Sequence, residues 1–220
     1  MFFAFGLGIY LFTKEYFQDE YQPLYTLLCI LFLWGKGWDG ANGYMFSSLV
    51  FTAYYPSVVS FAGIFFALTA LLKYVRQNKP IFSLLYIVLS TLIVLNHPLT
   101  GVLFLLISFL LVLTEQPVRK RNLLLCAFSC CIAIGVTVLW PYYSIIESIS
   151  FVAGNKVKEF WDYRATHQFL YSELFIRIGP GLLGIIPILY WGARRKYLFI
   201  VSGFFLCSMV YVLGYFFDIS

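Results

Sequence analysis

Charged residues are scarce in this chain, since Asp, Glu, Lys and Arg make up only 11% of its 220 residues. A soluble domain usually carries about 25% charge. Hydrophobic residues make up 61% and aromatic residues 21% of the chain, which is more apolar surface than a water-soluble fold of this length can hide. The composition therefore excludes an ordinary soluble domain and predicts an all-α protein, a polytopic transmembrane helical bundle.

Several signatures of enzymes are also missing. The chain has no G-x-x-x-x-G-K-[ST] P-loop, no H-E-x-x-H zinc pair and no G-x-S-x-G nucleophile elbow. Its five cysteines lie in apolar segments without His or Asp companions, so we interpret them as small packing residues and expect neither a metal site nor a disulfide framework. They are Cys29, Cys126, Cys130, Cys131 and Cys207. The sequence leaves any cofactor unknown.

Signals that would divide or target the chain are absent as well. The apolar stretch 1–12 has no basic n-region and no small-residue cleavage site, so it does not resemble a signal peptide. No internal repeat or low-complexity linker occurs, and we expect one transmembrane domain over 1–220. The first apolar segment is short and the chain stops straight after the last one, which suggests a piece of a longer protein.

Apolar segments fill most of the chain and predict about seven to eight membrane segments. The third contains Tyr54-Tyr55-Pro56-Ser57. Proline suits the first turn of a helix and disfavours helical geometry at the residue before it, so we expect a spanning helix to begin near Pro56. The segments run roughly 1–13, 24–35, 44–72, 81–95, 99–113, 123–140, 179–193 and 197–217.

The apolar run 81–113 has one polar interruption, Asn96-His97-Pro98, at its midpoint. Basic residues flank both ends of the run, and cationic clusters favour the cytoplasmic side of a membrane. Both ends then lie on one face, and the run is a short helical hairpin that turns at His97-Pro98. Each arm spans about 22 Å at ~1.5 Å per residue, less than the ~30 Å hydrocarbon core. The turn therefore stops inside the far leaflet.

Basic loops set the expected topology. We place the loops 73–80, 114–122 and 193–197 in the cytoplasm, and the stretches 36–55 and 141–178 on the outer side with the His97 turn. This assigns 10 Lys and Arg inside and five outside, as the positive-inside rule requires. The net charge of +5 is thus a topology signal and no sign of nucleic-acid binding. We expect a multi-pass protein of the lipid bilayer, in the plasma membrane of a prokaryote.

The His97 turn holds the first candidate substrate-binding residues. His97 can exchange a proton near neutral pH, and Asn96 and Thr100 add donors and acceptors beside it. An ionisable residue inside a membrane is a functional hypothesis by default. In the alternative, His97 caps the hairpin and bonds a backbone carbonyl, while Pro98 starts the second helix. The topology favours His97 as part of the floor of an outward-facing cavity over a proton relay.

The first outer stretch contains a glycine-rich loop over 34–44. Asp39 is its only acid and suits a general base that deprotonates an acceptor hydroxyl. Trp38 beside it would stack on a sugar face or anchor in the membrane interface. In the alternative, Asp39 forms an Asx turn with the backbone.

The outer stretch 142–178 holds the remaining candidates. Asp162, Glu173 and His167 are alternative acid–base candidates, and His167 is also a candidate for substrate binding. Arg164 and Arg177 would clamp a lipid phosphate, because guanidinium matches phosphate geometry. The alternative is an interfacial helix, rich in aromatic residues, that touches anionic lipid.

Three short stretches together resemble the GT-C superfamily, the polytopic glycosyltransferases that use lipid-phosphate-linked sugars. They are FSSLVFTAYYPS at 46–57, the helix end KYVR at 73–76 and the hairpin turn HPLTG at 97–101, and the similarity covers about residues 1–140. The resemblance implies an inverting transfer from a polyprenyl-phosphate-sugar donor, in which a carboxylate activates the acceptor hydroxyl. In that superfamily the catalytic acid usually follows the first helix. If that region lies upstream of Met1, Asp39 is not the base.

Two other classes of function stay open. A transporter or permease would use polar groups at mid-depth, but no apolar segment contains an acid, and His97 alone is a poor relay. A non-enzymatic multi-pass protein that organises lipid or partner proteins would use His97 for stability alone.

Overall fold

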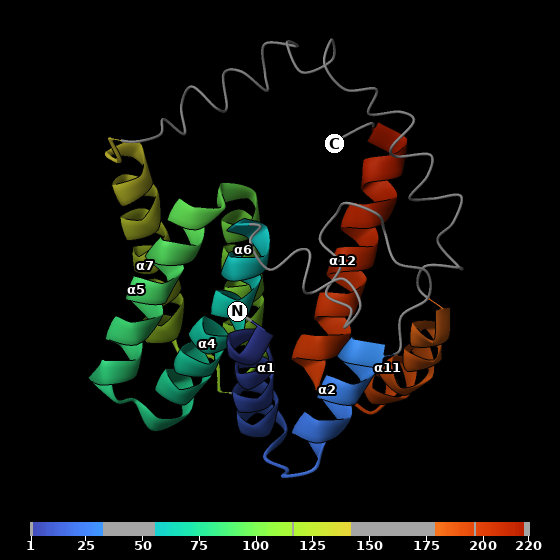
Figure 1. Ribbon diagram of the computed structural model, residues 1–220. Coiled ribbons are helices and arrows are strands. Elements are labelled where there is room, and N and C mark those ends of the chain that lie inside the picture. The colour runs from blue at the N-terminus through green and yellow to red at the C-terminus, as the bar shows by residue number, and fades with distance from the viewer. Residues whose placement is uncertain (1, 33–55, 116, 142–178, 196, 218–220) are drawn as a thin grey trace.

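A computed structural model describes residues 2–32, 56–115, 117–141, 179–195 and 197–217. These residues form eight α-helices and one 3-10 helix and contain no strand, which confirms the expected all-α class for the described part (Figure 1). The elements are α1 (Phe2–Phe17), α2 (Gln22–Phe32), α4 (Pro56–Gln77), α5 (Pro80–Asn96), α6 (Pro98–Thr114), α7 (Lys120–Val138), the 3-10 helix η2 (Gly179–Gly184), α11 (Ile185–Ala193) and α12 (Leu198–Phe217).

Helix α4 begins at Pro56, as the sequence predicts. It continues to Gln77, through most of the loop expected at 73–80. It stops because Asn78 takes the left-handed conformation, with φ 57°, and its N–H donates to the Tyr74 carbonyl at 2.8 Å. Asn adopts this conformation at lower cost than most residues. Pro80 then starts α5, so only two residues separate the two helices.

The predicted hairpin is present as α5 and α6, which have 17 residues each, or about 26 Å at ~1.5 Å per residue. His97 alone separates them. The two helices approach closely where Gly101 faces Val94, since a Cβ on Gly101 would lie 2.7 Å from the Val94 Cα. The missing side chain at Gly101 is therefore what lets α6 fold back against α5.

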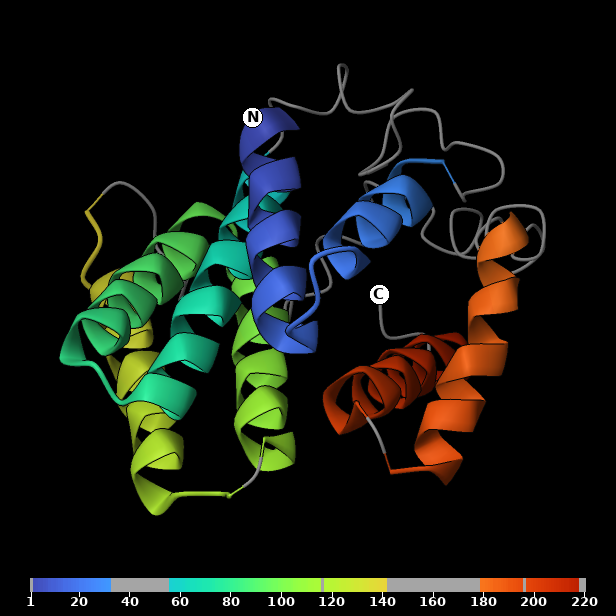
Figure 2. The ribbon, with the colours of Figure 1, turned by 90° about the horizontal axis from the view of Figure 1, so that it is seen from below.

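The main core lies among α1, α4, α5, α6 and α7. Its most completely buried members include Leu71, Tyr86, Phe104, Leu111 and Cys126. Figure 2 shows α11 and α12 to one side of this group, with α2 between. Helix α12 joins the core near its start, where Phe199 packs against Phe12 and Tyr16 of α1 with ring centroids 6.0 and 5.7 Å away.

Two described helical stretches are long and apolar enough to cross a membrane by length and composition, 59–77 in α4 and 120–138 in α7. Shorter apolar helices cover 80–96, 100–114 and 198–209. The expectation of about seven to eight membrane segments therefore goes beyond what the described helices show. Helices α5 and α6, with 17 residues each, are shorter than that length because the turn at His97 separates them.

The turns α1–α2, α4–α5, α6–α7 and α11–α12 gather at one end of the helices, which we call the basic end (Figure 1). Contacts between the turns confirm the arrangement: the Arg121 guanidinium lies 5.5 Å from the Tyr74 ring, and the Tyr197 ring lies 5.0 Å from that of Phe17. The hairpin turn lies at the opposite end, the His97 end. The described parts of the three basic loops thus lie at one end, and their predicted place in the cytoplasm stays a prediction.

Candidate functional site

His97 links the two helices of the hairpin through its backbone and its ring. Its backbone is extended, with φ −154° and ψ 93°, its N–H donates to the Ile93 carbonyl at 3.0 Å, and its carbonyl accepts from the Gly101 N–H at 2.9 Å. The ring nitrogen Nδ1 accepts from the Thr100 N–H at 3.3 Å and lies 2.8 Å from the Thr100 hydroxyl. An accepting Nδ1 carries no proton, so the neutral ring holds its proton on Nε2.

Asn96 ties the end of α5 to the start of α4. Its side-chain amide donates to the Pro56 carbonyl at 2.6 Å and to the Ser60 hydroxyl at 2.8 Å. The Ser60 hydroxyl in turn reaches the Ile93 carbonyl at 3.4 Å. Pro56 is the first residue of α4. The bond from Asn96 to its carbonyl therefore fixes the start of α4 against the end of α5.

The structure thus brings Asn96, His97 and Thr100 together and gives each of them a partner within the protein. This geometry matches the capping alternative for His97 in its main feature, with Pro98 starting α6. It differs in one detail, since the ring accepts from a backbone N–H instead of bonding a carbonyl. Substrate binding by these three residues stays a prediction.

The other predicted site residues lie outside the described residues. They are Trp38, Asp39, Asp162, Arg164, His167, Glu173 and Arg177. The helices next to these undescribed stretches are described. Helix α4 begins at the His97 end, where Asn96 contacts it. Helix α7 begins at the basic end and finishes at the His97 end (Figure 1).

Arg76 forms a polar cluster that the sequence analysis missed. Its Nε donates to the Glu115 carboxylate at 2.7 Å, and its terminal nitrogens reach the Glu15 and Tyr16 carbonyls at the end of α1. The Glu15 carboxylate lies 3.7 Å from the same guanidinium. The sequence analysis counted Arg76 only among the basic residues that set the topology, although one base and two acids at apolar segment ends are the signal for such a cluster.

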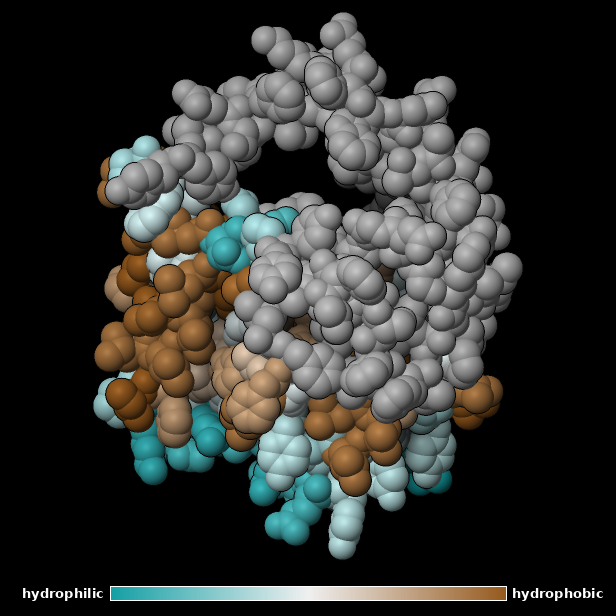
Figure 3. Space-filling model, viewed as in Figure 1, coloured by the Kyte–Doolittle hydropathy of each residue, from teal (hydrophilic) through white to brown (hydrophobic). Residues whose placement is uncertain are grey.

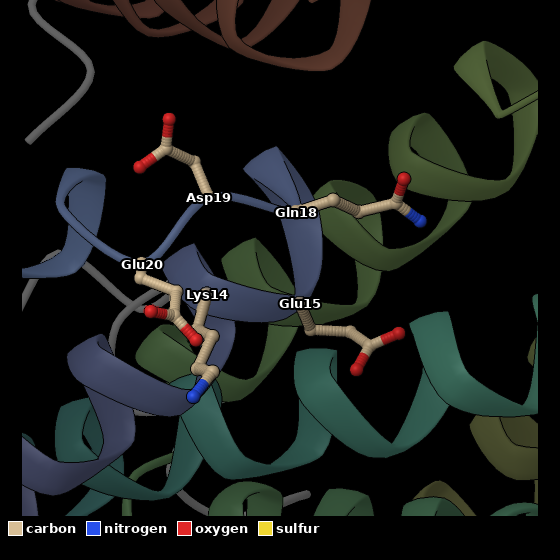
Figure 4. Close-up of a pocket in the computed structure, with 5 residues that line it drawn as sticks. All are labelled: Lys14, Glu15, Gln18, Asp19 and Glu20. Atoms are coloured by element: carbon tan, nitrogen blue, oxygen red, sulfur yellow. The ribbon is translucent and has the colours of Figure 1, made fainter.

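An open depression of about 340 Å³ lies beside this cluster, lined by Lys14, Glu15, Gln18, Asp19 and Glu20. Figure 4 shows that these side chains point in different directions and do not converge on one point. Asp19 has a local role, because its carboxylate accepts from the Tyr21 and Gln22 N–H groups at 2.7 and 3.2 Å and so caps the start of α2. Across the described ranges, no group of three or more His, Cys, Asp or Glu is placed to hold a metal ion.

No family model, no characterised protein and no solved structure matches this chain. The similarity to the GT-C superfamily therefore stays a prediction based on the short stretches that carry it.

Proposed function

We propose that this chain is a multi-pass membrane protein that transfers a sugar from a lipid-phosphate donor at its His97 end. The main support for a membrane location is the distribution of polar and apolar residues on α7, which is the reverse of that on a helix at the surface of a soluble protein. Its buried residues are all polar or small: Asn122, Cys126, Ser129, Ala133 and Thr137.

The exposed face of α7 is apolar. Leu124 is 68% exposed and Phe128 is 57% exposed, and Ile134 and Val138 are exposed too. A helix on the surface of a soluble protein shows the reverse pattern. Removing apolar surface from water stabilises a protein by about 25 cal/mol for each square ångström. Contact with lipid would therefore stabilise this exposed apolar face relative to contact with water.

Helices α5 and α6 also expose apolar residues, although most of their buried residues are apolar as well. Their exposed residues include Leu84, Leu92 and Leu106, and Figure 3 shows hydrophobic surface along the flank of the described helices, with hydrophilic residues at the basic end. Inside, the Ser90 and Ser108 hydroxyls donate to carbonyls of their own helices at 2.6 and 2.9 Å. Such bonds satisfy polar groups where no water is present.

A pair of arginine substitutions on α7 tests the membrane location. Phe128→Arg places a charge at mid-helix, which costs about 2.5–3.5 kcal/mol in a bilayer, so the full chain should lose membrane insertion measured by alkaline carbonate extraction. The matched control is Leu139→Arg, because Leu139 is 82% exposed just beyond the helix, where a charge reaches the interface. The location is wrong if the unmodified chain is released by carbonate, or if both variants remain equally resistant.

The proposed reaction is supported by the resemblance and by the helix ends. The undescribed stretch before α4 and the one after α7 join described helices at the His97 end. They contain the carboxylates Asp39, Asp162 and Glu173. In the proposed reaction one carboxylate takes the proton of an acceptor hydroxyl, whose oxygen attacks the anomeric carbon. The bond from that carbon to the phosphate oxygen breaks, and the polyprenyl phosphate leaves with inversion.

Three variants of the full chain test this reaction: Asp39→Asn, Asp162→Asn and Glu173→Gln. Membranes that contain each variant receive a radiolabelled polyprenyl-phosphate hexose, and transfer to an acceptor is measured. One variant should lose transfer while it keeps carbonate resistance. If all three transfer sugar as well as the unmodified chain, the catalytic assignment is wrong. Flux of a solute into liposomes without transfer would favour the transporter alternative.

A further inference from the structure

Five cations surround the neighbouring turns α4–α5 and α6–α7 at the basic end. We call this set the cationic patch: Lys73, Lys79, Arg119, Lys120 and Arg121. All are exposed except Lys73, which is half-buried. The two turns lie side by side, because the Arg121 guanidinium sits 5.5 Å from the Tyr74 ring of α4. Lys73 is held in a similar way, with its ammonium 5.6 Å from the Phe82 ring of α5.

The acid that leads into the α6–α7 turn does not pair with the cationic patch. Glu115 leads into the α6–α7 turn, but its carboxylate pairs with Arg76 at 2.7 Å. Glu15 pairs with the same guanidinium at 3.7 Å. Among the described residues, no ion pair involves a member of the patch. The patch therefore retains its positive charge for a partner outside the chain.

Two helices begin inside the patch, and neither start is capped by a side chain. Lys79 precedes α5 and Arg119 precedes α7, and neither residue makes a side-chain capping bond. The start of a helix carries partial positive charge and unpaired N–H groups. Both starts thus add to the charge of the five side chains and favour an anion that offers several oxygen acceptors.

Exposed apolar residues begin within a turn of the patch. They are Ile81 and Leu84 on α5 and Leu124 on α7, with exposed fractions of 61%, 58% and 68%. A phospholipid has the same arrangement, with a charged phosphate next to apolar chains. On this basis we infer that the cationic patch binds the phosphate headgroup of an anionic phospholipid whose acyl chains lie along α5 and α7. The inference rests on the proposed membrane location.

Competition between two lipids tests this inference. The full chain in neutral detergent is mixed with equal amounts of phosphatidylglycerol and phosphatidylcholine, and bound lipid is counted by native mass spectrometry. Phosphatidylglycerol should be preferred, and the preference should fall as ionic strength rises. Equal binding of the two lipids would overturn the inference. Displacement of the lipid by the same concentration of inorganic phosphate would also overturn it, because the site would then take free phosphate.

Two matched double variants distinguish an effect of the cationic patch from an effect of the protein's net charge. The double substitution Lys120→Gln with Arg121→Gln should weaken the preference for phosphatidylglycerol about 30-fold, given about 1 kcal/mol for each basic residue near an anionic surface. The control removes two charges from the same end, with Arg194→Gln and Arg195→Gln on the α11–α12 turn, and should leave the preference nearly unchanged. Equal losses in both variants would overturn the patch as the site.

Carbonate extraction distinguishes failure of this inference from failure of the proposed function. A chain that resists extraction but shows no lipid preference overturns the headgroup site alone. A chain that is released by carbonate overturns the membrane location, and the lipid site with it. Circular dichroism on each double variant confirms that the helices are retained, so that a loss of preference reports the patch.

Discussion

The Arg76 guanidinium on α4 lies 2.7 Å from the Glu115 carboxylate beyond α6, which joins two positions that are 39 residues apart in the chain. The same guanidinium donates to carbonyls at the end of α1. Helix-end carbonyls have no partner within their own helix, so Arg76 satisfies groups on one helix while it pairs with an acid next to another. Both charged side chains are only about a fifth exposed, at 21% and 20%.

Arg76→Gln should therefore be among the most destabilising substitutions at the basic end. It removes the charged partner of Glu115 and the donors for α1, and a hydrogen bond to a charged group contributes about 1.5–3 kcal/mol. Glu115→Gln should cost less, because the amide oxygen still accepts from Nε. Thermal unfolding in detergent measures both. The exposed Lys79→Gln is the control, and an Arg76→Gln variant as stable as this control would contradict the prediction.

His97 should behave as a helix cap in stability measurements. His97→Ala removes the acceptor of the Thr100 N–H and should cost about 1 kcal/mol, the usual cost of losing a cap. His97→Asn should restore most of the loss, because Asn is a good cap that needs no proton exchange. In the sugar-transfer assay, His97→Asn should retain activity if the role is capping alone. A stable but inactive Asn variant would show that the ring takes part in binding or chemistry.

The hairpin and the start of α4 could be predicted from the sequence because their signals are local. Proline sets the first turn of a helix, and Pro56, Pro80 and Pro98 each begin one. The composition likewise predicted helices throughout the described part. A hairpin between the basic loops 73–80 and 114–122 brings these two loops to one end, whereas their expected cytoplasmic side stays a prediction.

Other features depend on contacts between distant segments, and the sequence did not reveal them. The Arg76 cluster needs the ends of three helices to meet, and no spacing rule connects Glu15 with Glu115. The number of membrane segments stays a prediction, because the described residues include only two helical stretches that meet the length and composition of a membrane span. Of the predicted site residues, only Asn96, His97 and Thr100 fall in the described part, so the grouping of the others remains a prediction.

Gly101 and Gly135 give opposite expectations for the same substitution. A Cβ on Gly101 would lie 2.7 Å from the Val94 Cα, so Gly101→Ala must separate α5 from α6 and should cost about 1–3 kcal/mol, as overpacking does. A Cβ on Gly135 meets nothing within 4 Å. Gly135→Ala should stabilise α7 by about 0.5–1 kcal/mol, because alanine loses less entropy in a helix. Thermal unfolding compares the two, and equal effects would contradict the close approach at Gly101.

Ser129 provides a direct test of how the buried face of α7 packs. Its hydroxyl is fully buried, and it has no hydrogen-bond partner among the described residues. A buried polar group without a partner costs free energy, by about 1–3 kcal/mol in mutational data. Ser129→Ala removes the hydroxyl without adding volume, so thermal unfolding should show equal or greater stability.

Ser129→Val is the volume control at the same position. It also removes the hydroxyl, but it adds volume and β-branching where no surface is exposed, so it should cost about 1–3 kcal/mol. The ordering Ala, then Ser, then Val would indicate a tight interface in which the hydroxyl makes no favourable bond. If Ser129→Ala were clearly destabilising, the hydroxyl must bind a group such as an internal water molecule, and the buried face of α7 would then be hydrated where dry packing is expected.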